Sequence, residues 1–216
     1  MKKLSRRSVM GAAFLVCSGL LTAQAAELTA SSARGALEAF LKNTGSAAGR
    51  FTQSSFDRAG KPTAPESSGF FRFLRPGRFE WTYEKPYEQQ IMSNGKTLWL
   101  YDRDLMQVTV KALDASLPTT PAAILFGENA LDDDWTLREI GAGELEAVPK
   151  SSGAGFESVR LRFDAKGELA GMTLVDSFGQ TTLLTFSDLR REAQTDASFE
   201  FKVPEGADVL TDQSAF

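Results

Sequence analysis

Few residues of this chain could perform acid–base or metal chemistry. It contains no histidine and a single cysteine, Cys17. Zinc sites of histidine and cysteine, and Ser-His or Cys-His nucleophilic pairs, are therefore excluded. Asp102 and Asp104, in the sequence YDRD, could act as paired carboxylates, but acids in a turn more often face solvent. We predict no catalytic residue and no metal site, and the absence of a phosphate-binding or dinucleotide-binding glycine motif predicts no nucleotide cofactor.

The strongest chemical signal is an aromatic run that also carries an arginine. Residues 70–83 read FFRFLRPGRFEWTY, with six aromatic residues among fourteen. Because side chains alternate along a strand, Phe71, Phe73 and Arg75 share one face. If the next strand pairs back across Pro76-Gly77, its aromatic face joins theirs. That second face consists of Phe79, Trp81 and Tyr83.

Arg75 then points into the same apolar space as these rings. A buried guanidinium keeps its charge and is costly to leave without hydrogen-bond acceptors. The last carbonyls of a short helix lack partners within the helix, so we expect acceptors near the end of a helix at Pro121–Gly127. Two interpretations remain open: a lipid-binding cavity lined by these rings and held closed by Arg75, or an ordinary core in which Arg75 forms a salt bridge.

Local patterns place strands on both sides of this run. A helix capped by Ser31 or Ser32 is expected first, ending at Asn43 to Gly45. The short connections between the first six strands predict an antiparallel meander. About eleven strands and two or three helices are expected in all. The strands are expected at 49–56, 69–75, 78–84, 88–93, 96–102, 107–113, 135–140, 144–148, 157–164, 168–176 and 180–189, with a short last strand at Phe199 to Val203.

The middle of the chain breaks the strand pattern. Thr119 or Thr120 can cap a short helix with Pro121 at its first position, and Gly127 stops it. Its residues 122–126 are apolar nearly all round. This helix is therefore expected to be covered on more than one side.

The first 25 residues resemble a secretory signal. Basic residues precede an apolar stretch that is too short to span a bilayer, and Ala23-Gln24-Ala25 forms a small-x-small cleavage site. We expect residues 1–25 to be removed and residues 26–216 to form a single domain. Export by the general secretory route is favoured, with the twin-arginine route suggested by Arg6-Arg7. Val16 before Cys17 argues against acylation of this cysteine.

The charge balance argues against nucleic acid as a partner. Residues 1–25 hold four basic residues and no acidic one, so their removal changes the net charge from −4 to −8. An acidic chain without a basic block is a poor ligand for nucleic acid or an anionic membrane surface. No bound nucleic acid is therefore expected, and we expect a monomer.

Several blocks together resemble the LolA family of periplasmic outer-membrane lipoprotein carriers, over essentially the whole mature chain. These blocks are RFTQ at 50–53, GFFRFLRPGRFEW at 69–81, NGKTLWLYD at 94–102, QVTV at 107–110, Thr120-Pro121 and FEFKVPEG at 199–206. The resemblance implies a mainly β (α+β) fold, an unclosed antiparallel β-barrel with helices as a lid over a hydrophobic cavity. It also implies a periplasmic chaperone that accepts acylated lipoproteins from an inner-membrane ABC transporter. The chaperone would deliver them to an outer-membrane lipoprotein acceptor.

The same resemblance implies roles for particular positions. Arg75 is the lid latch, Phe79 is implicated in interaction with the transporter, and Ala122 and Leu125 fall on the lid. Ala122 is smaller than the residue of some relatives, so a looser lid is expected. The expected acyl-chain cavity consists of Leu37, Phe40, Leu41, Phe51, Phe71, Phe73, Phe79, Trp81, Ile91, Leu98, Leu100, Ile124 and Leu125.

Other functions remain open at this point. An open barrel of this shape could bind a different periplasmic lipid, such as a glycolipid or isoprenoid. It could also serve as an interaction or stress-sensing domain without an obligatory cargo. Catalysis by Asp102 and Asp104 is the least favoured alternative.

Overall fold

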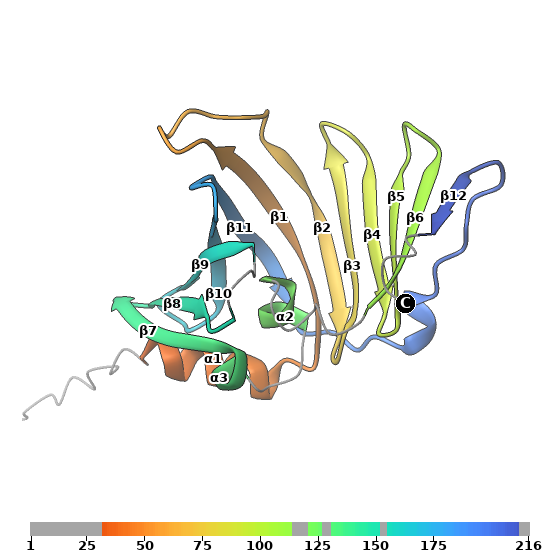
Figure 1. The fold of residues 1–216 in the computed structure, drawn as a ribbon. Coiled ribbons are helices and arrows are strands. Elements are labelled where there is room, and N and C mark those ends of the chain that lie inside the picture. The colour runs from red at the N-terminus through yellow and green to blue at the C-terminus, as the bar shows by residue number, and fades with distance from the viewer. Residues whose placement is uncertain (1–31, 114–120, 127–130, 152–154, 212–216) are drawn as a thin grey trace, which may run out of the picture.

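A single curved sheet dominates the computed structural model, which describes residues 32–113, 121–126, 131–151 and 155–211 (Figure 1). Twelve strands pair in the order β12-β6-β5-β4-β3-β2-β1-β11-β10-β9-β8-β7. The first half contains β1 (Ser46–Phe56), β2 (Ser67–Leu74), β3 (Arg78–Lys85), β4 (Gln89–Asn94), β5 (Thr97–Asp102) and β6 (Gln107–Ala112). The second half contains β7 (Trp135–Gly141), β8 (Glu144–Pro149), β9 (Phe156–Phe163), β10 (Leu169–Asp176) and β11 (Thr181–Arg190), and β12 (Asp208–Thr211) pairs with the first half.

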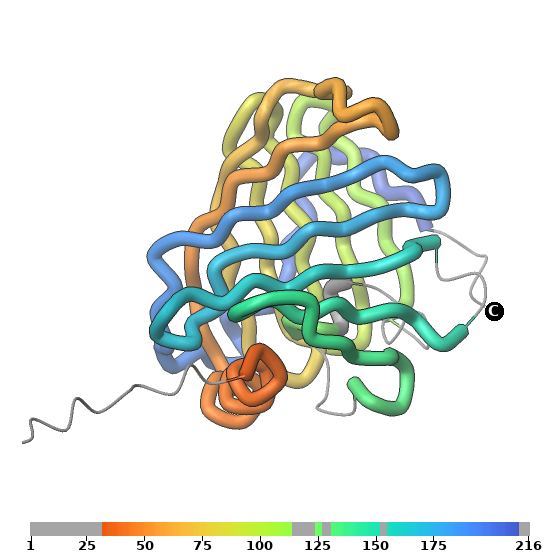
Figure 2. Tube along the Cα trace, turned by 90° about the vertical axis from the view of Figure 1, so that its left-hand side faces the viewer, coloured from red at the N-terminus to blue at the C-terminus, as the bar shows by residue number. Residues whose placement is uncertain are grey.

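The sheet folds over on itself but does not close. Viewed from the side, β7 to β11 cross in front of β2 to β6 (Figure 2). The two halves join where β1 pairs with β11, in antiparallel register from Phe56 opposite Thr181. Because β12 and β7 lie at opposite ends of the strand order and do not pair with each other, the described strands form an unclosed barrel with a concave and a convex face. The unclosed, mainly β architecture expected above is confirmed.

Three α-helices lie on the concave side or at its lower end: α1 (Ala33–Asn43), α2 (Pro121–Phe126) and α3 (Leu131–Asp134). The first begins as predicted, because the Ser32 hydroxyl accepts a hydrogen bond of 3.0 Å from the backbone N–H of Gly35. Its apolar stripe packs on the core through Ala33, Ala36, Leu37 and Phe40. The predicted stop at Gly127 and the caps at Thr119 or Thr120 lie outside the described residues.

Polar contacts fix both ends of α1. At its start, the backbone N–H of Arg34 donates to Glu139 of β7 at 3.0 Å. At its end, the buried Thr44 hydroxyl accepts from Arg191 at 3.1 Å, and Arg191 makes a bidentate ion pair of 2.9 Å to Glu168. This helix is therefore attached to the second half of the sheet at two separated points.

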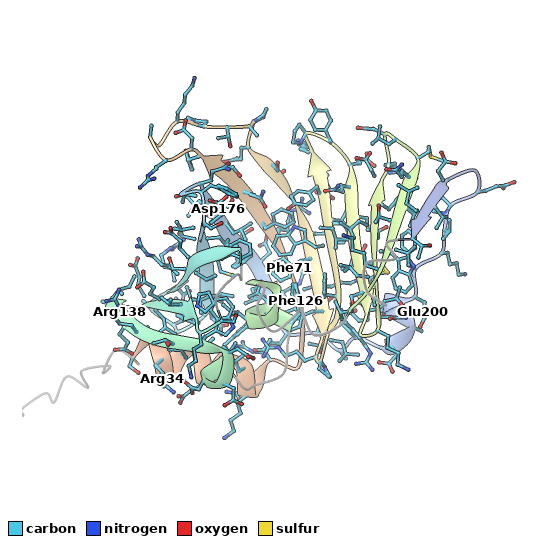
Figure 3. All side chains as sticks on the ribbon, viewed as in Figure 1. Arg34, Phe71, Phe126, Arg138, Asp176 and Glu200 are labelled. Atoms are coloured by element: carbon cyan, nitrogen blue, oxygen red, sulfur yellow. The ribbon has the colours of Figure 1, made fainter. Side chains whose placement is uncertain are left out.

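A second, smaller apolar cluster lies on the convex face. Phe199 and Val108 are fully buried there, and Phe201 stacks on Trp99 with ring centroids 5.8 Å apart. The 3₁₀ helix η2 (Asp196–Phe199) brings the carboxyl-terminal segment across β3 and β4. Figure 3 shows Glu200 of this segment on the side of the sheet opposite Phe126. The carboxyl-terminal segment thus covers part of the convex face.

The predicted last strand at Phe199 to Val203 is wrong. Phe199 ends η2, and residues 200–204 belong to no strand. The alternating aromatic residues mimic a strand, but they are spaced to cover the convex cluster. The last strand is instead β12, which pairs in parallel with β6 from Asp208 opposite Gln107 to Thr211 opposite Val110. Parallel pairing needs a long connection, so local sequence pattern does not reveal it.

Candidate functional site

An aromatic band crosses the concave face from β1 to β3. The register places Phe71 opposite Trp81 and Phe73 opposite Phe79, as the alternation predicted. The Phe51 ring stacks on Trp81 with centroids 4.1 Å apart, and Phe71 lies 5.4 Å from Trp81. All five of these side chains are buried. They form a continuous apolar wall rather than isolated core contacts.

The short helix α2 lies against this wall. Its Phe126 ring stacks on Phe79 with centroids 4.5 Å apart and contacts Phe73 at 5.5 Å. Ile124 is also buried, with 1% of its surface exposed. Figure 3 shows Phe126 and Phe71 both projecting into the space between the two halves of the sheet. The apolar wall is therefore covered, and α2 is its cover.

A backbone hydrogen bond joins α2 to the sheet. The N–H of Gly77, in the turn between β2 and β3, donates to the carbonyl of Phe126 at 2.7 Å. Gly77 has a φ of 71°, which a residue with a side chain rarely adopts. A carbonyl at the end of α2 thus finds a partner in the turn. Aromatic contact and this single bond are the described links between α2 and the aromatic strands.

Arg75 lies beneath the other helix, α1. Its guanidinium carbon is 5.0 Å from the centroid of the Phe40 ring and 5.3 Å from that of Phe73. Nη1 donates to the carbonyl of Leu41 over a long 3.5 Å, whereas Nε and Nη2 are buried without a partner among the described residues. Burial lowers the pKa of Arg75 to about 10, so it remains charged at neutral pH. The acceptor lies on α1 and not, as predicted, near the end of the helix at Pro121–Gly127.

The structure brings the predicted cavity residues together on one side of the sheet. Leu37 and Phe40 reach the core from α1, and Ile124 and Leu125 reach it from α2. Leu41, Ile91 and Leu98 are partly buried against that core. Leu100 is half-buried opposite Ile91. The side chain of Ala122 lies outside what the structure describes.

Phe79 is buried under α2 in this arrangement. Only 5% of its surface is exposed, and its ring is stacked against Phe126. A partner protein could touch Phe79 only after α2 has moved away from the sheet.

The second half of the sheet supplies cavity-facing residues that the sequence did not single out. Phe186 of β11 lies 5.4 Å from Phe71, centroid to centroid. The apolar face continues across the neighbouring strands, because Leu184 of β11 lies opposite Met172 of β10, and Met172 lies opposite Leu161 of β9. Alternation in these strands was visible, but only the pairing of β1 with β11 shows that their apolar face meets the aromatic wall.

The described residues offer little support for catalysis or metal binding. The Asp102 carboxylate accepts a hydrogen bond of 3.0 Å from the backbone N–H of Leu105, which gives it a role in the turn. Within the described ranges, no group of three or more potential metal ligands gathers. No helix in that part of the chain has the length and apolar character needed to cross a bilayer.

Comparison with known proteins gives consistent matches. Residues 42–202 match the family model described as outer membrane lipoprotein carrier protein LolA. An outer-membrane lipoprotein carrier protein of Ralstonia nicotianae is 46% identical over 214 residues, covering 94% of this chain and 98% of the relative. One of Methylococcus capsulatus is 42% identical over 204 residues, covering 92% of this chain and 95% of the relative.

A solved structure shares the fold at low sequence identity. It is an uncharacterized conserved protein of Thermus thermophilus, 17% identical, with a TM-score of 0.52. The match covers 83% of this chain and 99% of that one. This likeness concerns the fold alone.

Proposed function

This chain belongs to the LolA family of outer membrane lipoprotein carrier proteins, and we propose that it is a periplasmic carrier that shields the acyl chains of lipoproteins. The observation that supports this most directly is the aromatic wall covered by a six-residue helix. An ordinary core would be sealed by longer elements attached at many points. Here the cover is short, and aromatic stacking accounts for much of its attachment.

The chemistry of the wall suits saturated chains. Each methylene removed from water contributes about 0.8 kcal/mol, so an acyl chain crosses an aqueous compartment slowly unless it is shielded. Phe51, Phe71 and Trp81 offer a buried aromatic surface on which such chains could pack. Acyl chains would replace Phe126 and Ile124 as the occupants of this surface when α2 moves aside.

We propose that α2 is the moving part of the lid and that α1 stays in place. The first helix is held at both ends by Glu139 and by the Thr44–Arg191–Glu168 contacts. The bond from Gly77 to Phe126 and the ring contacts are the described links from α2 to β2 and β3. A ligand that binds only the open state shifts the population toward it.

Arg75 was expected to latch the lid, but its described acceptor lies on α1, which stays in place. We propose that Arg75 instead keeps release of the cargo feasible. Its guanidinium is desolvated and only weakly hydrogen-bonded, so the closed arrangement carries a cost that opening relieves. Replacing it with leucine would make the interior more apolar and favour retained acyl chains. Arg75→Leu should therefore accept lipoprotein but pass it on poorly. Transfer at the wild-type rate would rule out this role of Arg75, and Arg50→Leu, on an exposed arginine, serves as the matched control.

The proposed partners follow from the carrier role. Cargo would come from a lipoprotein-releasing ABC transporter in the inner membrane and would leave to an acceptor in the outer membrane. Because the transporter supplies the energy, the carrier itself needs no nucleotide site. Phe79 would meet the transporter only in the open state, since Phe126 covers it in the closed one.

The decisive experiment measures release of a lipoprotein into solution. The exported protein is added to spheroplasts that make a triacylated, outer-membrane-destined lipoprotein, and the supernatant is assayed for a one-to-one complex. Release that depends on the protein, and that falls strongly with Phe79→Glu, is expected. Circular dichroism of that variant separates loss of function from loss of folding. If a known carrier releases cargo and this protein does not, the proposal fails, and lipid mass spectrometry would test a different ligand.

A further inference from the structure

On β3 to β5 the register divides the concave face into an apolar and a polar level. Trp81, Ile91 and Leu100 lie opposite one another on β3, β4 and β5. The next level on the same face lies two positions further along each strand, toward the β3–β4 connection. It consists of Tyr83, Gln89 and Asp102, which again lie directly opposite one another. On β2 and β1 the register continues this level through Gly69 and Phe51, and Gln53 opposite Ser67 lies two residues further out. These five residues, Gln53, Ser67, Tyr83, Gln89 and Asp102, are called the polar row.

The polar row lies at the end of the barrel away from α1. The β1–β2, β3–β4 and β5–β6 connections meet at this end (Figure 1). A hollow of about 530 Å³ opens there, lined by all five residues of the polar row and by loop residues such as Pro65, Pro86 and Leu105. It is large enough for a small polar head, and it adjoins the level of Trp81 directly. A molecule with acyl chains on the apolar level would place its head in this hollow.

The polar row offers neutral hydrogen-bonding groups. The Tyr83 hydroxyl donates to Gln53 at 3.0 Å, and burial raises the pKa of this tyrosine, so it stays protonated. The amide of Gln53 keeps its N–H groups, and the side chain of Gln89 makes no hydrogen bond within the described ranges. The amide N–H groups of Gln53 and Gln89 are therefore the donors that could reach ester or amide carbonyls, and the Tyr83 hydroxyl orients the Gln53 amide.

The charges around the hollow have one sign. Glu88 is paired with Arg103. Asp102 and Asp104 also line the hollow and form no ion pair within the described part of the chain. None of the described lining residues is basic. A phosphate in the hollow would thus meet two uncompensated carboxylates and no cation, which is unfavourable.

From these observations we propose that the hollow binds the uncharged head of the acylated cargo, and that its carboxylates exclude lipids bearing a phosphate. The donors of the polar row hold the ester and amide carbonyls of an acylated glyceryl-cysteine. This inference rests on the proposed carrier function and adds a basis for choosing lipoproteins over the phospholipids that surround them. It also assigns Asp102 and Asp104 a role in excluding phosphate-bearing lipids, in place of the catalytic role considered above.

Three lipid probes with the same palmitoyl or hexadecyl chains test the inference. The first is a fluorescent tripalmitoyl glyceryl-cysteinyl peptide, the second is its analogue with ethers in place of the two glycerol esters, and the third is fluorescent dipalmitoyl phosphatidylglycerol. Affinities are measured by anisotropy on the full exported protein. Tyr83→Phe keeps the ring and removes the hydroxyl that orients the Gln53 amide. Tyr101→Phe, which removes a hydroxyl bonded to Met106, is the matched control.

The wild-type protein should prefer the ester probe to the ether probe by about fivefold, the difference that one or two net hydrogen bonds make. Tyr83→Phe should lose most of that preference, and Tyr101→Phe should keep it. The double variant Asp102→Asn, Asp104→Asn should bind phosphatidylglycerol about fivefold more tightly than the wild type at low salt, with the gain shrinking at high salt.

Equal affinities for the ester and ether probes, or equal behaviour of Tyr83→Phe and Tyr101→Phe, would overturn the inference. So would an unchanged affinity of the double variant for phosphatidylglycerol. In each case tight binding of the lipopeptide would leave the carrier function standing. Failure of the wild type to bind any probe would overturn both.

Discussion

Replacing Phe126 with alanine should release α2 from the aromatic wall without unfolding the sheet. This ring lies 4.5 Å from Phe79, 5.5 Å from Phe73 and 6.5 Å from Trp81, measured between centroids. It is also 2% exposed, so Phe126→Ala discards almost the whole buried surface of one large side chain. No other described ring of α2 replaces these contacts.

The size of the effect follows from the buried ring. Core Phe→Ala substitutions cost about 3–5 kcal/mol. We take the lower end, about 3 kcal/mol, because α2 can shift instead of leaving a rigid void. Since about 1.4 kcal/mol is a factor of ten, the open state should become about 100-fold more populated. The free energy of global unfolding should fall by a similar amount, because unfolding loses the same ring contacts, so the measurement must report the opening of α2 itself.

Amide hydrogen exchange at Gly77 reports this opening directly, because its N–H donates to the Phe126 carbonyl. In Phe126→Ala, exchange at Gly77 should accelerate about 100-fold, because the opening of α2 breaks the contacts of this ring. The matched control is Phe199→Ala, which empties an equally buried site on the convex face. If both variants accelerate Gly77 equally, α2 opens only when the whole domain unfolds, and the lid argument is refuted.

Two further predictions concern stability. Gly69→Ala should lower the urea midpoint by the equivalent of about 3 kcal/mol, because a Cβ there would lie 1.8 Å from the Thr82 carbonyl oxygen, whereas Gly45→Ala, with no atom within 4 Å, should change it little. A comparable effect of both would show that the close approach is not what requires glycine. Arg138 beside Glu146 lowers the pKa of that carboxyl below 4.5. The ionised Glu146 carboxylate therefore stabilises the fold fully above pH 4.5, and this stabilisation is lost as the pH falls through the folded-state pKa. Glu146→Gln should make the free energy of unfolding depend less on pH in this acidic range. An unchanged pH dependence would contradict the role given to Glu146.

The local patterns predicted most elements of the fold. The positions of the first six strands, of α1 and of the helix beginning at Pro121 follow from periodicity and capping residues, which act within a few residues of the chain. The parity of Phe71, Phe73, Phe79 and Trp81 was also predicted from alternation, and the structure bears it out. The resemblance to the carrier family came from blocks of residues that the comparisons then matched over residues 42–202.

Other features depended on contacts between distant segments. Phe199 to Val203 has the alternation of a strand, yet its aromatic residues cover the convex face, because Phe201 meets Trp99 there. The last strand, β12, pairs with β6 across about a hundred residues of intervening chain. No short-range pattern contains information about such a pairing.

The site itself shows the same division. The sequence by itself determined that Arg75 is a cation among aromatic rings, because strand alternation is a property of neighbouring residues. Tertiary structure alone decided that its carbonyl acceptor is Leu41 of α1 and that Phe126 covers Phe79. It also brought Tyr83, Gln89 and Asp102 opposite one another, because register between strands is set by the pairing of whole elements. Local chemistry therefore predicted which side chains face the cavity, and only the folded chain determined which of them meet.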